Sequence, residues 1–87
     1  MSDDISAEEL SLSLIPAVEQ QLESSETPFV KEHFDRLIQE DEIDEHEAKK
    51  MIALCLADEV ETMQKEQRSF NLPRYQQMVQ FLPLLPE

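Results

Sequence analysis

The chain contains no glycine in its 87 residues, and this absence constrains its fold more than any other feature of the sequence. Loops that bring backbone amides around a phosphate need glycine, so neither a dinucleotide-binding fingerprint nor a P-loop is possible. The Asn-Gly and Asp-Gly turns of tight β-hairpins are excluded as well. Because the chain is rich in the helix formers Leu, Glu, Gln, Ala and Met, we expect an all-α protein.

Apolar residues recur along the chain at intervals of three and four residues, the spacing of one helical face. Four helices are predicted on this pattern, over residues 6–24, 28–40, 44–67 and 71–82. Each prediction begins at a residue whose side chain can accept a hydrogen bond from a free backbone amide. These capping residues are Ser6, Thr27, Asp44 and Asn71. Short connections between four helices fit a small antiparallel bundle.

Pro16 interrupts the first predicted helix. Proline lacks an amide donor and crowds the carbonyl four residues earlier, so we expect a kink or a break near Leu12. The alternative is a disordered start followed by a helix that begins at Ile15.

The whole chain, residues 1–87, is predicted to be one helical domain. We expect residues 1–5 to be disordered and residues 84–87 to form an extended tail after the last helix. The unbroken apolar run 51–57 predicts that the third helix is buried around most of its circumference and occupies the centre of the bundle.

Negative charge dominates the first half of the sequence. The formal net charge is −13, and residues 1–47 hold 15 acidic and two basic residues, whereas the remaining residues hold five of each. We expect these acids to form a solvated outer coat. Such a field repels phosphate groups, so direct binding of nucleic acid is not expected, and a basic protein is the natural complement.

Cysteine usage and the N-terminal sequence suggest a cytoplasmic protein. Cys55 is the single cysteine, so no internal disulfide can form. No basic residue precedes an apolar run at the N-terminus, and no apolar stretch approaches eighteen residues. Secretion and membrane insertion are therefore not expected.

No residues form a recognisable catalytic, cofactor-binding or metal-binding motif. The acidic pairs lie in polar runs, and the run 41–47 lacks the glycine that a calcium-binding loop needs. His33 and His46 lie on different predicted helices, and Cys55 lies in the most apolar part of its helix, where burial suppresses thiol reactivity. We therefore expect no enzyme activity, no cofactor and no metal.

Large apolar residues crowd the last eighteen positions. They could simply close the bundle, or they could form a surface for self-association or for docking a partner, with Tyr75 and Phe81 as aromatic anchors. The candidate surface comprises Phe70, Tyr75, Met78, Phe81, Leu82, Leu84 and Leu85.

Several segments resemble the C-terminal half of a family of uncharacterised bacterial helical proteins, a domain of unknown function. The likeness covers most of residues 10–82 and rests on apolar spacing and a few identities. The segments that carry it are Leu10-Ser-Leu-Ser-Leu-Ile-Pro-Ala-Val-Glu-Gln-Gln-Leu22, Phe34-Asp-Arg-Leu37, Cys55-Leu-Ala-Asp-Glu59, Arg68 and Arg74-Tyr75.

The resemblance implies two pairs of histidines, each four residues apart, that could bind a metal between helices. This chain departs from that pattern. Ser11 and Ile15 stand where the first pair would be, and Lys50 replaces the second member of the other pair, which leaves His46 alone. The resemblance therefore implies a degenerate member that has lost any such metal site.

The sequence leaves more than one function open. The leading hypothesis is a non-enzymatic, acidic helical interaction or structural module that binds a protein partner or forms a homodimer. The alternative is a nucleic-acid mimic, such as an antitoxin-like inhibitor, whose carboxylates on the first two helices replace phosphates on a basic partner.

Overall fold

The computed structural model describes residues 7–85, and these residues form helices without any strand. The all-α prediction is therefore confirmed for this part of the chain. The predicted cap Ser6 and the predicted disordered segment 1–5 lie outside the described residues. The helices are α1 (Ala7–Ser13), α2 (Ile15–Leu22), α3 (Pro28–Gln39), α4 (Glu45–Glu66) and α5 (Leu72–Phe81).

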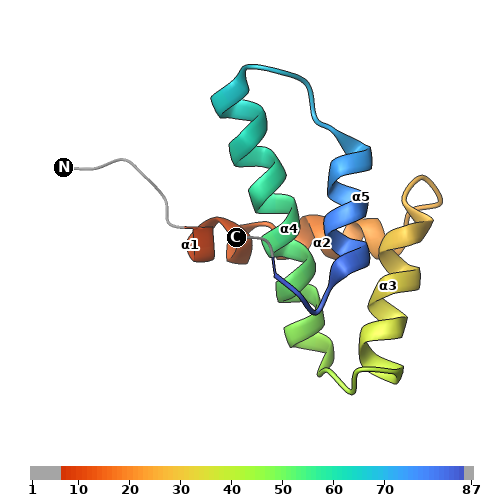
Figure 1. Ribbon diagram of the computed structural model, residues 1–87. Coiled ribbons are helices and arrows are strands. Elements are labelled where there is room, and N and C mark those ends of the chain that lie inside the picture. Colours follow the sequence, from red (N-terminus) through yellow and green to blue (C-terminus); the bar gives the residue numbers. More distant parts are fainter. Residues whose placement is uncertain (1–6, 86–87) are drawn as a thin grey trace.

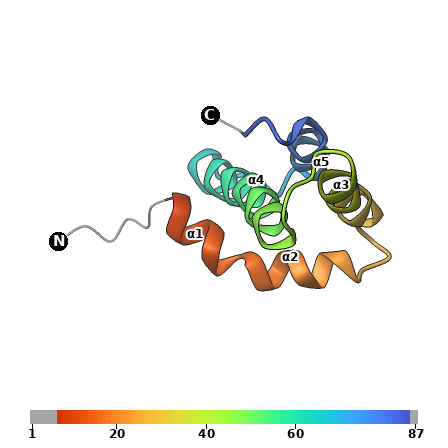
Figure 2. The ribbon, with the colours of Figure 1, turned by 90° about the horizontal axis from the view of Figure 1, so that it is seen from below.

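Three helices lie side by side and alternate in direction: α3, α4 and α5 (Figure 1). The broken pair α1–α2 crosses them on one side, where α1 packs against α4, and α2 packs against α3 and α4. Figure 2 shows the C-terminal segment on the opposite side of these three helices. The first predicted helix, residues 6–24, is therefore not a fourth antiparallel member of the bundle. In its place, α1 and α2 cross the other three helices on one side.

The break predicted from Pro16 is present, but it lies at Leu14 rather than near Leu12. Leu14 is the residue before α2, and Pro16 lies in the first turn of α2. A missing amide donor costs nothing there, because the first amides of a helix have no partner within the helix. The Leu14 amide still bonds the Leu10 carbonyl at 3.1 Å, so the two helices follow one another closely.

The three predicted caps within the described residues all lie at N-cap positions, and two of them form the expected side-chain hydrogen bond. The side chains of Asp44 and Asn71 each accept a hydrogen bond from a first-turn amide at 3.1 Å, as expected for N-cap residues. Thr27 makes no such bond. Its hydroxyl instead donates to the Gln21 carbonyl at 3.1 Å, which ties the end of α2 to the start of α3.

The left-handed conformations that glycine would ordinarily take are filled here by larger residues. Gln67 ends α4 with φ 53°, and the Arg68 amide bonds back to the Met63 carbonyl at 3.1 Å, which is the usual way to end a helix. Glu42, in the turn between α3 and α4, has φ 56°. The chain thus makes its sharp turns without glycine, at some cost in backbone strain.

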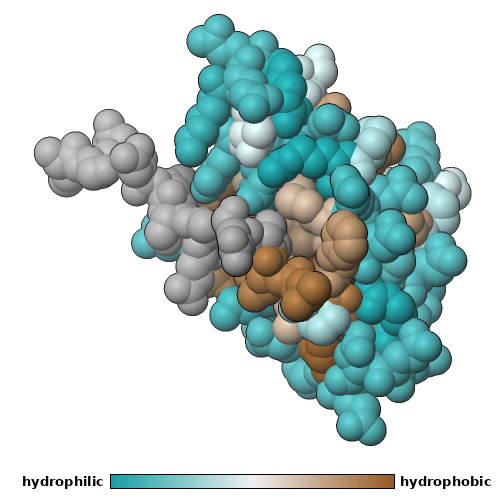
Figure 3. Space-filling view, viewed as in Figure 1, coloured by the Kyte–Doolittle hydropathy of each residue, from teal (hydrophilic) through white to brown (hydrophobic). Residues whose placement is uncertain are grey.

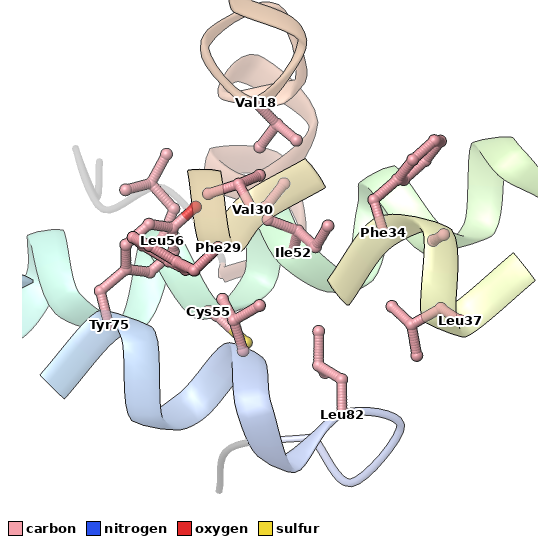
Figure 4. Packing of buried hydrophobic residues seen from close by; sticks show 13 residues of the cluster. Val18, Phe29, Val30, Phe34, Leu37, Ile52, Cys55, Leu56, Tyr75 and Leu82 are labelled. Atoms are coloured by element: carbon pink, nitrogen blue, oxygen red, sulfur yellow. The ribbon is translucent and has the colours of Figure 1, made fainter. Parts of the chain in front are cut away.

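The hydrophobic core lies where α4 meets α2, α3 and α5 (Figure 4). Tyr75 of α5 is fully buried, and its ring packs edge-on against Phe29 of α3 at a centroid distance of 5.6 Å. Every residue of the run 51–57 is at least half-buried, so the prediction of a central α4 is confirmed. The buried apolar residues are Val18, Phe29, Val30, Phe34, Leu37, Ala48, Ile52, Ala53, Cys55, Leu56, Ala57, Tyr75, Val79 and Leu82.

Candidate functional site

The end of α5 carries three large apolar side chains at the surface. Phe81, Leu84 and Leu85 are 57%, 73% and 48% exposed, and we call them the C-terminal patch. Leu82 inserts into the core, a cis peptide bond joins it to Pro83, and the Leu84 amide donates to the Phe81 carbonyl at 3.0 Å. Figure 3 shows apolar side chains gathered in the middle of this face of the molecule. The predicted extended tail thus begins with a turn at Leu84, and residues 86–87 lie outside the described part.

Two residues of the predicted surface are buried, so their assignment to it is wrong. Tyr75 has no exposed area because its ring packs in the core, and its hydroxyl donates to Gln21 Oε1 at 2.6 Å. Leu82 is 2% exposed. Both follow the helical spacing of the α5 core face, which also holds Val79, so they help to close the bundle.

The remaining residues of the predicted surface do not form one continuous area. Phe70 is 38% exposed and contacts the Tyr75 ring at 5.8 Å, at the start of α5. The C-terminal patch lies at the other end of this ten-residue helix, about 15 Å away at the usual helical rise. Met78 lies between them and is half-buried. The structure therefore separates Phe70 from the patch.

The segment of the chain that carries the patch contains no acidic residue. No Asp or Glu occurs between residues 67 and 85, although the chain has a net charge of −13. The exposed polar side chains of α5 include three glutamines, Gln76, Gln77 and Gln80. This segment therefore exposes amides and apolar side chains on an otherwise anionic molecule. The two charges beside the Leu82 carbonyl, Arg36 and Asp41, pair with one another at 3.2 Å.

Arg36 of α3 holds the end of α5 in place. Its Nη1 donates to the Leu82 carbonyl at 2.9 Å, and its Nη2 donates to the carbonyls of Val79 and Gln80 at 3.4 Å each. A cation there satisfies free carbonyls and complements the helix dipole. Asp41 accepts a further hydrogen bond from Nη1 at 3.2 Å. These bonds fix the backbone at the end of α5, which carries the patch, against α3.

A buried ion network joins α4 to α5 at the other end of the molecule. The Glu59 side chain has no exposed area. Arg68 donates to both of its carboxylate oxygens at 2.7 and 3.0 Å, the Asn71 amide donates at 2.6 Å, and Arg74 donates at 3.0 Å. Arg74 also donates to Asp58 at 2.6 Å. Together these bonds hold the connection between α4 and α5 against α4.

The network keeps Glu59 ionised. Hydrogen bonds from Arg68, together with those from Asn71 and Arg74, outweigh the effect of burial and lower the pKa of Glu59 to about 2. A carboxylate that is ionised at neutral pH, and whose two oxygens already accept four hydrogen bonds, is poorly suited to act as a general acid or base. We therefore assign the network to stability rather than to chemistry.

The sequence reasoning missed this network, and Glu59 departs from the expectation that the acids form a solvated outer coat. A signal was present in the helical spacing. Glu59 follows Cys55 and Leu56 by four and three residues, so it continues the inward-facing stripe of α4. An acid on an apolar stripe calls for a buried cation, and Arg68 and Arg74 are the nearest arginines in sequence.

Cys55, His33 and His46 do not come together in one site. Cys55 is buried, and burial chiefly raises the pKa of its thiol to about 12. His33 accepts a hydrogen bond from Arg36 Nε at 3.2 Å, and burial together with that guanidinium lowers its pKa. His46 is exposed in the first turn of α4. Among the described residues, no three His, Cys, Asp or Glu side chains lie close enough to hold a metal ion.

The densest group of acids lies at the turn between α3 and α4. On α2 and α3, Glu19 pairs with Lys49 at 3.0 Å and Asp35 pairs with Lys31 at 3.2 Å, which partly neutralises those helices. No Lys or Arg occurs between residues 37 and 48. The exposed acids of this acidic end are Glu40, Asp41, Glu42, Asp44, Glu45 and Glu47.

A depression of about 490 Å³ lies between α2 and α3. Lys31 and Asp35 at its edge pair with one another, and no thiol or histidine lines it. Ser24 Oγ in its lining accepts a hydrogen bond from the Glu26 amide at 3.1 Å. Its lining is Leu22, Glu23, Ser24, Ser25, Pro28, Lys31, Glu32 and Asp35.

None of the helices within residues 7–85 combines the length and the apolar character needed to span a bilayer.

The chain matches no protein-family model, no curated protein and no solved structure. The resemblance to a family of helical proteins therefore stays a prediction. Among the residues compared with its histidines, Ser11 is buried, Ile15 is half-buried and His46 is exposed.

Proposed function

We propose that this protein is a non-catalytic interaction module that binds a protein through the C-terminal patch. The observation that carries the proposal is the exposure of Phe81, Leu84 and Leu85 within a stretch of nineteen residues, 67–85, that contains no acid. Large apolar side chains grouped at a surface mark sites of protein contact. Although the chain has such an excess of acids, none of them falls within this stretch.

The anchored position of the patch supports this role. Leu82 is buried directly between Phe81 and Leu84, and Arg36 bonds the carbonyls at the end of α5. The three apolar side chains therefore need little further ordering when a partner binds, which lowers the entropic cost of association. A frayed tail with the same residues would lose that advantage.

Photo-cross-linking tests the proposal directly. We would place p-benzoylphenylalanine at Phe81 in the full chain and irradiate it both in cells and as purified protein. The matched control carries the same group at Leu12, which is 46% exposed on α1. We expect protein adducts from position 81 and few from position 12. Absence of adducts at position 81 under both conditions would refute the proposal.

The acidic end supports a second candidate function, the capture of a basic partner in place of nucleic acid. Six exposed acids lie within residues 40–47, with no Lys or Arg among them. They are denser there than on α2 and α3, where lysines pair with Glu19 and Asp35. A charge-driven complex should dissociate steeply between moderate and high salt, whereas retention in high salt would contradict mimicry.

We place the protein in the cytoplasm. The support is that its single cysteine, Cys55, is a buried free thiol, which is ordinary in a reducing compartment.

A further inference from the structure

We propose that the partner of the C-terminal patch is a second copy of this chain, related by a two-fold axis that passes near the patch. This inference rests on the proposed function and names its partner. Three features of the described surface lead to a second copy.

Charge determines which surfaces two copies can bring together. Each copy carries a net charge of −13, so surfaces lined with acids repel one another. The stretch 67–85 has no acid, and its two arginines already pair with Glu59 and Asp58. Beside the end of α5, Asp41 pairs with Arg36. The exposed side chains of residues 67–85 therefore form a surface on which close approach between two copies meets little electrostatic opposition.

The polar side chains exposed along α5 are complementary to their own image. Around a two-fold axis, each residue meets the same set of residues on the other copy, so a charged rim would repel its own image. Gln76, Gln77 and Gln80 are exposed along α5. A glutamine side chain both donates and accepts hydrogen bonds, so it can pair with another glutamine. Exposed amides along α5 thus suit a second copy of the same surface.

The apolar contact is of moderate size. Phe81, Leu84 and Leu85 would pack against the same residues of the second copy and exclude water from the centre of the contact. Three such side chains with a short helix face cover less than the roughly 800 Å² per partner of a standard stable interface. We therefore expect a reversible dimer with a dissociation constant in the micromolar range.

Sedimentation equilibrium of the full chain tests the dimer, with concentrations from one to several hundred micromolar at low and moderate salt. We expect dimer to form at tens of micromolar and to strengthen as salt screens the repulsion between copies. A charge-driven contact would respond in the opposite way. A chain that stays monomeric throughout this range at both salt concentrations would overturn the proposal.

Substitutions locate the contact. Leu84→Glu places a charge opposite its image and should weaken the dimer by roughly tenfold or more. Leu12→Glu, on α1, should leave it unchanged, and circular dichroism would check that both variants fold. A dimer that tolerates Leu84→Glu as well as it tolerates Leu12→Glu would place the contact elsewhere.

Opposite charges test the two-fold symmetry. Leu84→Glu and Leu84→Lys should each be largely monomeric alone, and an equimolar mixture should recover the dimer because unlike charges then face each other. Failure to recover would contradict a two-fold axis near Leu84. The cross-linking test separates the two proposals: an adduct of position 81 with another protein, and none with a second copy, supports the interaction module and refutes the dimer.

Discussion

At the scale of single residues, Glu59 has the most demanding environment in the described structure. Its carboxylate has no exposed area, and two arginines and a backbone amide supply four hydrogen bonds to its two oxygens. The arginines that cover it are 27% and 35% exposed, so the network closes one end of the bundle rather than lying deep within it. Loss of the charge leaves these donors without their acceptor.

Glu59→Gln should lower the free energy of unfolding by about 2 to 3 kcal/mol, because it replaces charge-assisted bonds with a side chain that brings donors of its own. The control is Glu61→Gln, on the same helix and half-buried, which should change stability by less than about 0.5 kcal/mol. Urea unfolding at neutral pH measures both. Equal effects of the two substitutions would contradict the role assigned to Glu59.

The pH dependence of that difference gives a separate check. The pKa of Glu59 falls from an ordinary 4.5 to about 2 in the folded protein, so its ionised form stabilises the fold fully above about pH 4.5. The contribution is lost as the pH falls toward 2. The stability gap between wild type and Glu59→Gln should therefore shrink over this interval. A gap that stays constant down to pH 2 would contradict the lowered pKa.

At the scale of helices and turns, the lack of glycine has a measurable cost. Gln67 ends α4 in the left-handed region, where a side chain with a Cβ is strained by about 1 kcal/mol. Gln67→Gly should therefore raise the free energy of unfolding by about 0.5 to 1 kcal/mol. Gln64→Gly, inside the last turn of α4, should lower it by about the same amount. Thermal unfolding measures both variants. A lower free energy of unfolding for Gln67→Gly would contradict backbone strain at Gln67.

Helix starts were predictable because they depend on local chemistry. Asp44, Asn71 and the proline that follows Thr27 each begin a helix within a residue of the expected position, since caps and proline act on the adjacent backbone. The break caused by Pro16 was also predictable, but its position was not. It falls at Leu14 because Pro16 takes a place in the first turn of α2, the helix that packs against α3 and α4.

Contacts between distant parts of the chain were harder to predict. Tyr75 and Leu82 looked like candidates for the surface, but the helical stripe of α5 places both in the core. The Glu59 network joins residues 9 and 15 positions apart, and periodicity alone does not identify the partner of a buried acid. Of the two roles left open for them, Phe81, Leu84 and Leu85 take the exposed one: Phe81 is the last residue of α5, and the other two follow it.

At the scale of the whole molecule, charge and apolar surface lie in different places. The acids gather at the turn between α3 and α4, whereas the C-terminal patch lies in a stretch without acids. The broken pair α1–α2 covers the opposite side of α3, α4 and α5 from the C-terminal segment (Figure 2). Within the described residues, the fold therefore leaves the acid-free segment 67–85 accessible, and we assign self-association to its C-terminal patch.

The most direct measurement is a dilution series followed by amide NMR, from several hundred to a few micromolar at moderate salt. The account predicts concentration-dependent shifts concentrated in residues 76–85, with the acidic end, residues 40–47, unchanged. Shifts confined to the acidic end, or a spectrum that does not change with concentration, would contradict it.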